Sequence, residues 1–307
     1  MTAITLDIIK LAISNFINPR KKLELSTASS YTNYLEYHNG NHDKYLKNYN
    51  FETSLIPKDN GDFTLNGFCH VCNKSVPFIV DFLYSYEING KLTPNWRERL
   101  LCPQCNLNNR LRAALHIFDD ILKPKPDSNI YITEQTTPLY NHLKLQYPNL
   151  VGSEYLGDSV QMGYSNEAGI RNEDLTQLSF QEDELDFILT FDVLEHIPDY
   201  QKALTECFRC LKPNGFMLFS IPFALMDEKN IVRARLNKEG GIDHLLPPEY
   251  HGDPINSDGL LCFYHFGWQL LEEMNAIGFK DTKALFYWSS HFGYLGGNQF
   301  MFMARKP

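Results

Sequence analysis

The pattern of apolar and polar positions changes sharply near residue 128. From there onward, short apolar runs of strand length alternate with amphipathic segments of helical length. This alternation predicts a doubly wound α/β domain with a mostly parallel sheet. The predicted strands are NIYITEQ, NLVGSEYL, GIRNEDL, ELDFILTFDV, GFMLFSIPF, DTKALFYW and NQFMFMAR, and the predicted helices are PLYNHLKLQY, DYQKALTECFRCL and FGWQLLEEMNAIG.

The amino-terminal part has a different texture. Residues 1–60 are polar, rich in Tyr and Asn, and show no sustained strand pattern, so we expect helices and loops packed on the rest. Apolar residues at helical spacing (Ile4, Ile8, Leu11 and Phe16) predict an amphipathic docking helix. The basic residues follow this apolar stretch, which is the reverse of their order in a signal peptide.

Three regions are therefore expected. Residues 1–60 form the helical or irregular region, and residues 61–127 form a module with two Cys-x-x-Cys pairs that ends at the proline-rich linker LKPKPDS. Residues 128–307 form the α/β domain. One connection, residues 224–264, is far longer than the others, and long loops in compact domains are usually functional or disordered.

Composition narrows the function classes. The chain has 307 residues, 43% of them hydrophobic, yet no apolar run approaches the roughly 20 residues that span a bilayer, so a transmembrane protein is not expected. A net charge of −9 argues against a general nucleic-acid binder. Only a local basic patch (Arg97, Arg99, Arg110 and Arg112) speaks for nucleic acid. Seven cysteines without a signal peptide indicate a reducing compartment, which we take to be the cytoplasm.

The cysteine pairs predict a metal site. FCHVC and LLCPQC carry two Cys-x-x-Cys turns, separated by 29 residues that can form a hairpin or an extended excursion. Two such turns present four thiolates to a tetrahedral ion and make a closed structural site. We expect Zn²⁺ at Cys69, Cys72, Cys102 and Cys105; the alternatives are four buried thiols, or His70 as a substitute ligand. The third pair, Cys207 and Cys210, has the spacing of residues that face the core from one helix.

Residues 184–223 carry the most specific run, ELDFILTFDVLEHIPDYQKALTECFRCLKPNGFMLFSIPF. Its strand, acidic turn, helix and second strand resemble the class I S-adenosylmethionine-dependent methyltransferase family, and the resemblance extends over about residues 128–307. It implies a Rossmann-like, seven-stranded sheet in which NQFMFMAR is the antiparallel seventh strand. It also implies methyl transfer from S-adenosylmethionine to a small molecule.

An acidic side chain at the end of the second strand can accept hydrogen bonds from both ribose hydroxyls of such a cofactor. That residue is Glu154, and Tyr155 beside it offers a face for the adenine. The resemblance implies that Asp174 accepts from the adenine amino group, where the alternative is an ordinary turn-capping Asp. It places Asp192 near the methionine moiety or the substrate.

The first motif departs from the family pattern. Its members usually have a Gly-x-Gly turn after the first strand, but this chain has Glu134, Gln135, Thr136 and Thr137 there. We expect Glu134 to bind the methionine ammonium and Thr136 or Thr137 to bind the carboxylate.

The long connection concentrates groups for acceptor chemistry. It leaves the fifth strand at the cofactor edge, so residues 224–264 are expected to form a substrate lid. The string HLLPPEYHGDP resembles a lid in methyltransferases of glycan and cell-surface biosynthesis, which suggests a saccharide acceptor. Methyl transfer to a hydroxyl needs alignment and removal of a proton, a task that suits histidine. We expect His251, oriented by Asp253, to do this, with His244 and His196 as further candidates.

Two other functions stay open. A catalytically degenerate methyltransferase fold could act as a binding or scaffold protein, as the missing glycines suggest. Tyr140 and Lys144 have the Tyr-x-x-x-Lys spacing of nicotinamide-dependent sugar oxidoreductases, but they lie on the first helix instead of after the fourth strand. The sequence is silent on oligomeric state.

Overall fold

The computed structural model describes residues 21–252 and 259–307, which form two compact units. The first unit comprises residues 21–26, 38–123 and 286–300 of the described chain, and the second comprises residues 27–37, 124–285 and 301–307. The predicted docking helix with Ile4 lies outside the described residues. The three-part division expected from the sequence stays a prediction.

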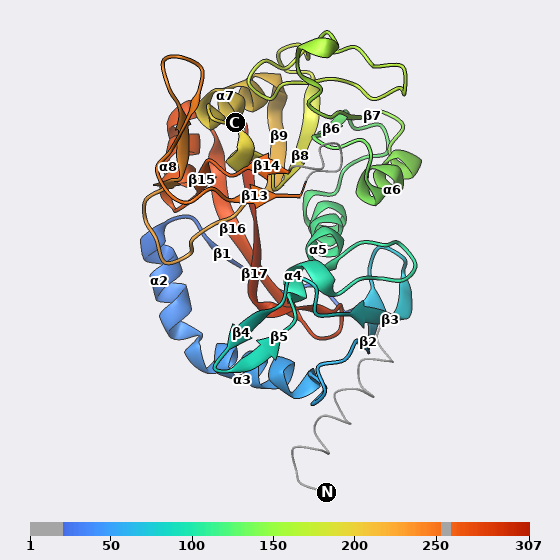
Figure 1. Ribbon diagram of the computed structural model, residues 1–307. Coiled ribbons are helices and arrows are strands. Elements are labelled where there is room, and N and C mark those ends of the chain that lie inside the picture. Colours follow the sequence, from blue (N-terminus) through green and yellow to red (C-terminus); the bar gives the residue numbers. More distant parts are fainter. Residues whose placement is uncertain (1–20, 253–258) are drawn as a thin grey trace, which may run out of the picture. The chain divides into compact units, whose positions relative to one another are not determined.

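A seven-stranded sheet with the order β1-β16-β17-β9-β8-β6-β7 forms the main β structure (Figure 1). Strands β6, β7, β8 and β9 run parallel to one another, and β17 is antiparallel to β9, as the sequence predicts for the seventh strand. Its strands are β1 (Leu25–Ala28), β6 (Ile130–Ile132), β7 (Leu150–Gly152), β8 (Leu185–Phe191), β9 (Leu211–Ser220), β16 (Lys280–Ser289) and β17 (Tyr294–Arg305).

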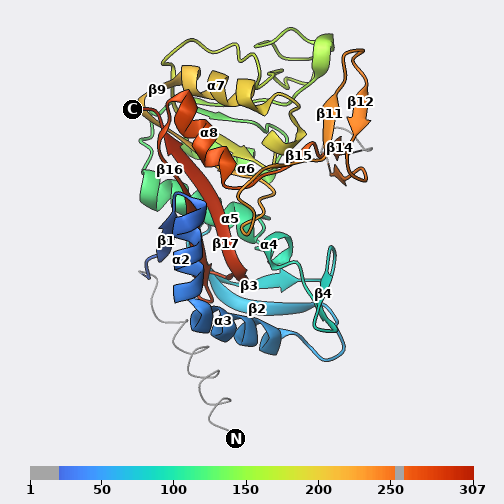
Figure 2. The ribbon, with the colours of Figure 1, turned by 90° about the vertical axis from the view of Figure 1, so that its left-hand side faces the viewer.

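Continuous apolar runs explain the central strands. In β8, the sequence LDFILTF is buried at six of its seven positions, which is typical of a parallel strand covered on both faces. Helix α7 (Tyr200–Cys210) begins where the Asp199 side chain accepts from the Lys202 N–H, and it buries Cys207 and Cys210. Helix α8 (Gln269–Ile277) lies beside α7 (Figure 2), and the rings of Phe208 and Phe279 pack edge to face.

One predicted strand is wrong. The segment GIRNEDL, residues 169–175, contains no strand and makes only isolated bridges, of which one joins Asn172 to Glu154. The reason is that its polar side chains serve the surrounding loops: Asn172 binds Leu156 N–H, and Glu173 binds Arg171. The sheet still has seven strands, because β1 joins it in place of this segment. No strand was expected in the region that contains β1.

The lid predicted at residues 224–264 contains short antiparallel pairs. Strand β10 pairs with β15, β11 with β12, and β13 with β14. Their bounds are β10 (Ile231–Val232), β11 (Ala234–Leu236), β12 (Ile242–His244), β13 (Tyr250–His251), β14 (Leu260–Leu261) and β15 (Tyr264–His265).

The first unit is built on two hairpins. Strands β2 (Phe63–Cys69) and β3 (Lys74–Val80) pair over seven residues, and β4 (Tyr86–Ile88) and β5 (Lys91–Thr93) pair across an Asn-Gly turn (Figure 2). The second hairpin is the one the sequence allowed between the cysteine pairs. The helices are α3 (His42–Leu55), α4 (Trp96–Arg99), α5 (Asn109–Ile117) and the short π-helix Phe118–Leu122; α2 (Tyr31–Gly40) is divided between the units.

Glu52 on α3 is a buried carboxylate that links β16 to β17 in this unit. It is 5% exposed and accepts from Trp288 Nε1 at 2.7 Å and from the N–H groups of Gly296 and Gly297 at 2.8 and 3.1 Å. Among residues 21–252 and 259–307 there is no helix with the length and hydropathy that a bilayer crossing needs.

We expect Glu52→Ala to lower the free energy of unfolding by about 3 kcal/mol, because it leaves several buried donors without an acceptor. Glu52→Gln should cost less, because its remaining carbonyl oxygen can still accept. Urea unfolding measures both, with Glu87→Gln at an exposed site as the matched control. Equal stability of Glu52→Ala and Glu87→Gln would contradict the assigned role.

Candidate functional site

Acidic residues follow the carboxyl ends of three adjacent parallel strands. Glu134 comes after β6, Glu154 after β7 and Asp192 after β8, and the registers of these strands place their ends at the same edge of the sheet. This edge is where open α/β sheets bind their ligands. The structure therefore brings three predicted cofactor residues to one edge.

Glu154 holds the glycine-free turn in place. Its Oε1 accepts from Gln135 N at 2.8 Å, from Thr136 N at 3.0 Å and from Thr136 Oγ1 at 2.9 Å. Within the described residues, Oε2 accepts no hydrogen bond. One oxygen thus organises the turn, while the other is left for a ligand hydroxyl.

A glycine does serve this turn, but it lies on the neighbouring strand. A Cβ atom on Gly152 would lie 2.6 Å from the backbone oxygen of Glu134 and 2.5 Å from the ring of Tyr140. Side chains in the turn itself are tolerated because Thr137 caps α6 (Pro138–Gln146) by accepting from Tyr140 N, and Pro138 occupies the first helical turn.

The proposed adenine side is built from loops. Tyr155 is 67% exposed, which leaves a ring face open for stacking. Asp174 uses Oδ1 to accept from Thr176 N at 2.7 Å, as a turn-capping Asp does. Both residues lie near the single bridge between Glu154 and Asn172.

Asp192 has a strained backbone at the end of β8. Its φ is 54°, in the left-handed region that non-glycine residues rarely adopt. Two contacts with Ser220 on β9 hold this conformation: Asp192 N donates to Ser220 O, and Asp192 Oδ1 accepts from Ser220 Oγ at 2.7 Å. Such strain concentrates at functional sites. After Asp192 the chain continues to His196, the next predicted residue.

Glu195 and His196, which follow Asp192, form a cluster with His251 of the lid. Glu195 Oε1 lies 3.7 Å from His196 Nε2 and 3.5 Å from His251 Nδ1. Glu195 is 0% exposed, and neither of its carboxylate oxygens has a hydrogen-bond partner among the described residues. Near the end of the lid, Phe263 N donates to Glu195 O at 2.8 Å.

Glu249 connects the histidines of the lid. Its Oε1 accepts from His251 Nε2 at 3.0 Å and from His265 Nε2 at 3.1 Å, and its Oε2 lies 3.0 Å from Arg233 Nη2. His196 is oriented separately, because its Nδ1 lies 2.8 Å from the carbonyl oxygen of Leu261. The lid is therefore tied to the turn after β8 by polar contacts.

Electrostatics couple these groups. Glu195 and, less strongly, Glu249 raise the pKa of His251 to about 8, in spite of the opposing effect of its burial. Burial raises the pKa of Glu195 above its ordinary value, and the charge of Asp192 adds to this rise.

The remaining catalytic predictions fare differently. His244 is exposed on β12 and does not join the cluster. Asp253 lies outside the described residues, and the described carboxylates beside His251 are Glu249 and Glu195. Sequence reasoning did not assign a role to these two glutamates. The signal for Glu195 was its place beside His196 in the turn after an apolar strand.

Four cysteines of the first unit converge as the sequence predicts. The Sγ atoms of Cys69 and Cys105 are 3.9 Å apart, those of Cys72 and Cys102 are 3.7 Å apart, and all four lie within 4.8 Å of one another. Four sulfurs about 2.3 Å from a tetrahedral ion would be about 3.8 Å apart. The donor set and its spacing therefore fit a zinc ion.

Both cysteine turns have the same construction. An asparagine in the left-handed conformation follows each pair, Asn73 with φ 50° and Asn106 with φ 58°; Asn73 N donates to His70 O, and Asn106 N donates to Cys102 O. His70 points to other partners: its ring stacks on His116, and its Nε2 lies 3.5 Å from Asp119.

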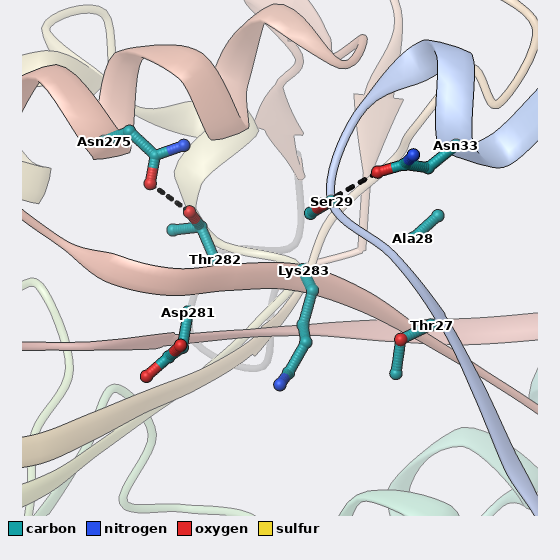
Figure 3. Close-up of a pocket in the computed structure, with 8 residues that line it drawn as sticks. All are labelled: Thr27, Ala28, Ser29, Asn33, Asn275, Asp281, Thr282 and Lys283. Atoms are coloured by element: carbon teal, nitrogen blue, oxygen red, sulfur yellow. Dashed lines mark hydrogen bonds between the residues drawn. The ribbon is translucent and has the colours of Figure 1, made fainter.

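A separate polar pocket of the second unit has no predicted site residue in its lining (Figure 3). Two pairs of its side chains bond to each other, Ser29 to Asn33 and Thr282 to Asn275. Asp281 is paired with Arg305, which leaves Lys283 as the other charged group of the lining. This pocket carries no arrangement of groups for catalysis.

The family model described as "Methyltransferase domain" matches residues 141–219. This match contains β7, β8, α7 and almost all of β9, and thus Glu154 and Asp192, whereas Glu134 lies just before it. Residues 141–219 are similar to methyltransferase domains.

A curated relative points the same way. A protein of Mycolicibacterium smegmatis named "Probable S-adenosylmethionine-dependent methyltransferase" is 38% identical over 53 residues, which are 17% of this chain and 21% of the relative. The chain thus spans about a fifth of the length of that relative. Both sequence matches support an S-adenosylmethionine-dependent methyltransferase.

Solved structures similar to the chain include S-adenosylmethionine-dependent methyltransferases. One from Mesorhizobium loti has 14% identity and a TM-score of 0.37, with 64% of this chain and 96% of that chain covered. One from Thermotoga maritima has 18% identity and a TM-score of 0.37, with 64% and 90% covered.

We expect Glu154→Ala to speed amide hydrogen exchange at Gln135 and Thr136 by about tenfold or more, because both N–H groups lose their acceptor. Glu154→Gln should have a smaller effect, because its carbonyl oxygen can replace Oε1. Exchange followed by NMR or mass spectrometry measures this, with exposed Glu182→Ala as the control. Unchanged exchange in Glu154→Ala would show that the turn is held by other contacts.

Proposed function

We propose that the protein transfers a methyl group from S-adenosylmethionine to a small-molecule or saccharide acceptor. The observation that carries the proposal is the set of acidic side chains after β6, β7 and β8, in and beside the region that matches the methyltransferase-domain family. The acceptor class follows from the polar lid, and a place in cell-surface glycan biosynthesis in the cytoplasm is part of the same proposal.

The cofactor would be held by residues on both sides of the strand ends. Glu154 accepts from the ribose hydroxyls through Oε2, and Tyr155 stacks on the adenine, whose amino group Asp174 accepts from. Glu134 and Asp192 supply negative charge toward the methionine ammonium. Thr136 is placed next to the methionine carboxylate, although its hydroxyl and N–H both bind Glu154.

The acceptor would bind between the strand ends and the lid. Transfer is an in-line displacement at the sulfonium, so the protein must align the acceptor oxygen and assist the loss of its proton. We assign acceptor activation to the cluster of His251 and His196, with His244 on the neighbouring hairpin as the second choice. The proposal keeps two residues that orient His251, namely Glu249 and Asp253, of which Asp253 was expected from the sequence.

We propose Zn²⁺ at Cys69, Cys72, Cys102 and Cys105. A site closed by four thiolates leaves no position for substrate, so the ion would stabilise the first unit and take no part in the transfer. The cysteines belong to the core of this unit, where they pack with Phe78, Trp96 and Leu100.

Calorimetry with S-adenosylhomocysteine tests the cofactor site. Wild type should bind, Glu154→Ala should bind at least about tenfold more weakly because a charged acceptor and the order of the turn are both lost, and Glu134→Ala should also weaken binding. Glu182→Ala is the control. If wild type gives no heat at high micromolar ligand, the enzyme proposal fails and a binding or scaffold protein becomes the better interpretation, as the glycine-free turn would suggest.

Loss of zinc should destabilise the first unit. We expect native mass spectrometry to find a zinc ion that is absent from Cys72→Ser/Cys105→Ser, and thermal unfolding to begin at lower temperature in this variant, because metal binding is coupled to folding. Restoration of stability by Zn²⁺ in chelated wild type, but not in the variant, is the control. A variant that keeps wild-type stability but loses all activity would contradict a structural role.

A further inference from the structure

The cluster of Glu195, His196 and His251 has the geometry of a metal site. The two separations from Glu195 Oε1, 3.7 Å to His196 Nε2 and 3.5 Å to His251 Nδ1, are too long for good hydrogen bonds. Atoms that share one ion at about 2.1 Å, at a tetrahedral angle, lie about 3.4 Å apart. These separations therefore fit ligands of a common cation better than they fit direct pairs.

The far nitrogen of each imidazole is fixed by an acceptor. His196 Nδ1 is 2.8 Å from the Leu261 carbonyl oxygen, which can only accept, so Nδ1 carries the proton. His251 Nε2 is 3.0 Å from Glu249 Oε1 and donates to it. A neutral imidazole then has its lone pair on the other nitrogen, and in both rings that nitrogen is the one close to Glu195. Carboxylate and carbonyl partners of this kind orient histidines that bind metals.

The ring planes agree with this arrangement. The rings of His196 and His251 are 4.9 Å apart at 86°, so two ring edges can face one point. The histidines of the first unit differ: His70 and His116 are stacked at 3.7 Å with only 10° between their planes, so their lone pairs cannot both point at one ion.

Glu195 supplies a second and independent observation. It is 0% exposed and has no hydrogen-bond partner for either oxygen among the described residues. A buried carboxylate without partners costs several kcal/mol, so its charge must be balanced. Glu249 does not need the same cation, because Arg233 lies 3.0 Å from its Oε2.

We propose that Glu195 Oε1, His196 Nε2 and His251 Nδ1 bind a divalent first-row transition-metal cation. Two imidazoles and one carboxylate suit such ions and leave positions open for another oxygen. Its role rests on the proposed function. The acceptor hydroxyl occupies an open position, loses its proton to solvent water, and forms the O–CH₃ bond as the sulfonium C–S bond breaks and leaves a neutral thioether. His251 thus activates the acceptor as a ligand.

The test uses Co²⁺ with the full-length protein that holds one equivalent of Zn²⁺, in the cysteine site, and no S-adenosylmethionine. Calorimetry should detect one equivalent of Co²⁺ beyond the zinc. The absorption spectrum of this bound Co²⁺ should lack the thiolate charge-transfer absorption that the cysteine site would give. His196→Ala and Glu195→Gln should abolish this binding. Glu249→Gln should weaken it by about tenfold or more, because His251 loses its orienting partner. His142→Ala on α6 is the matched histidine control.

The result that would overturn the proposal is the absence of a Co²⁺ equivalent outside the cysteine site, or equal affinity in wild type and His196→Ala. The cluster would then be a buried ion pair of Glu195 with His251. Circular dichroism checks that each variant is folded, and His196→Ala carries the test if Glu195→Gln is not. Because S-adenosylhomocysteine binding is measured separately, a protein that binds Co²⁺ but not this ligand would reject the proposed function and keep the metal site.

Discussion

The α/β domain depends on a single carboxylate oxygen, Oε1 of Glu154, which accepts three hydrogen bonds from the turn after β6. A glycine-rich turn usually fits against a cofactor because its backbone can come close. Here the space comes from Gly152 on β7, where any side chain would clash with Glu134 or Tyr140. The missing glycines of the motif are therefore a rearrangement in which a strand glycine and a strand-end glutamate together shape the turn.

The same device recurs in other parts of the chain. Glu52 accepts from Trp288 and from the N–H groups of Gly296 and Gly297, and Glu249 binds two lid histidines and Arg233. At Glu52 the carboxylate accepts from backbone N–H groups as well as from an indole, whereas at Glu249 all these partners are side chains. Charged acceptors make stronger hydrogen bonds than neutral ones, which explains how short lid strands of two or three residues keep a defined position.

The sequence predicted what local pattern determines. The run from β8 through α7 to β9 was clear because a continuous apolar strand, an Asp cap and a second apolar strand follow one another closely. The convergence of the four cysteines followed from their spacing. The sequence pattern could not predict that residues 169–175 lie outside the sheet or that Leu25–Ala28 belongs to it, because pairing with a distant strand decides both. The approach of His251 to Glu195 is likewise set by the path of the lid.

The negative charge of Glu195 restricts how its contact with His251 can be interpreted. Arg233 compensates Glu249, so the charge of buried Glu195 is left to a proton on His251 or to a cation shared with His196. The two states exclude each other, because a protonated imidazole has no lone pair to give. The two states also differ in the residues that they link. A proton joins the lid to Glu195 through one imidazole, whereas a cation would join β13 to both residues of the turn after β8. Occupation by metal would therefore fix His251 and the turn after β8 at one point, beside the strand ends where the cofactor is proposed to bind.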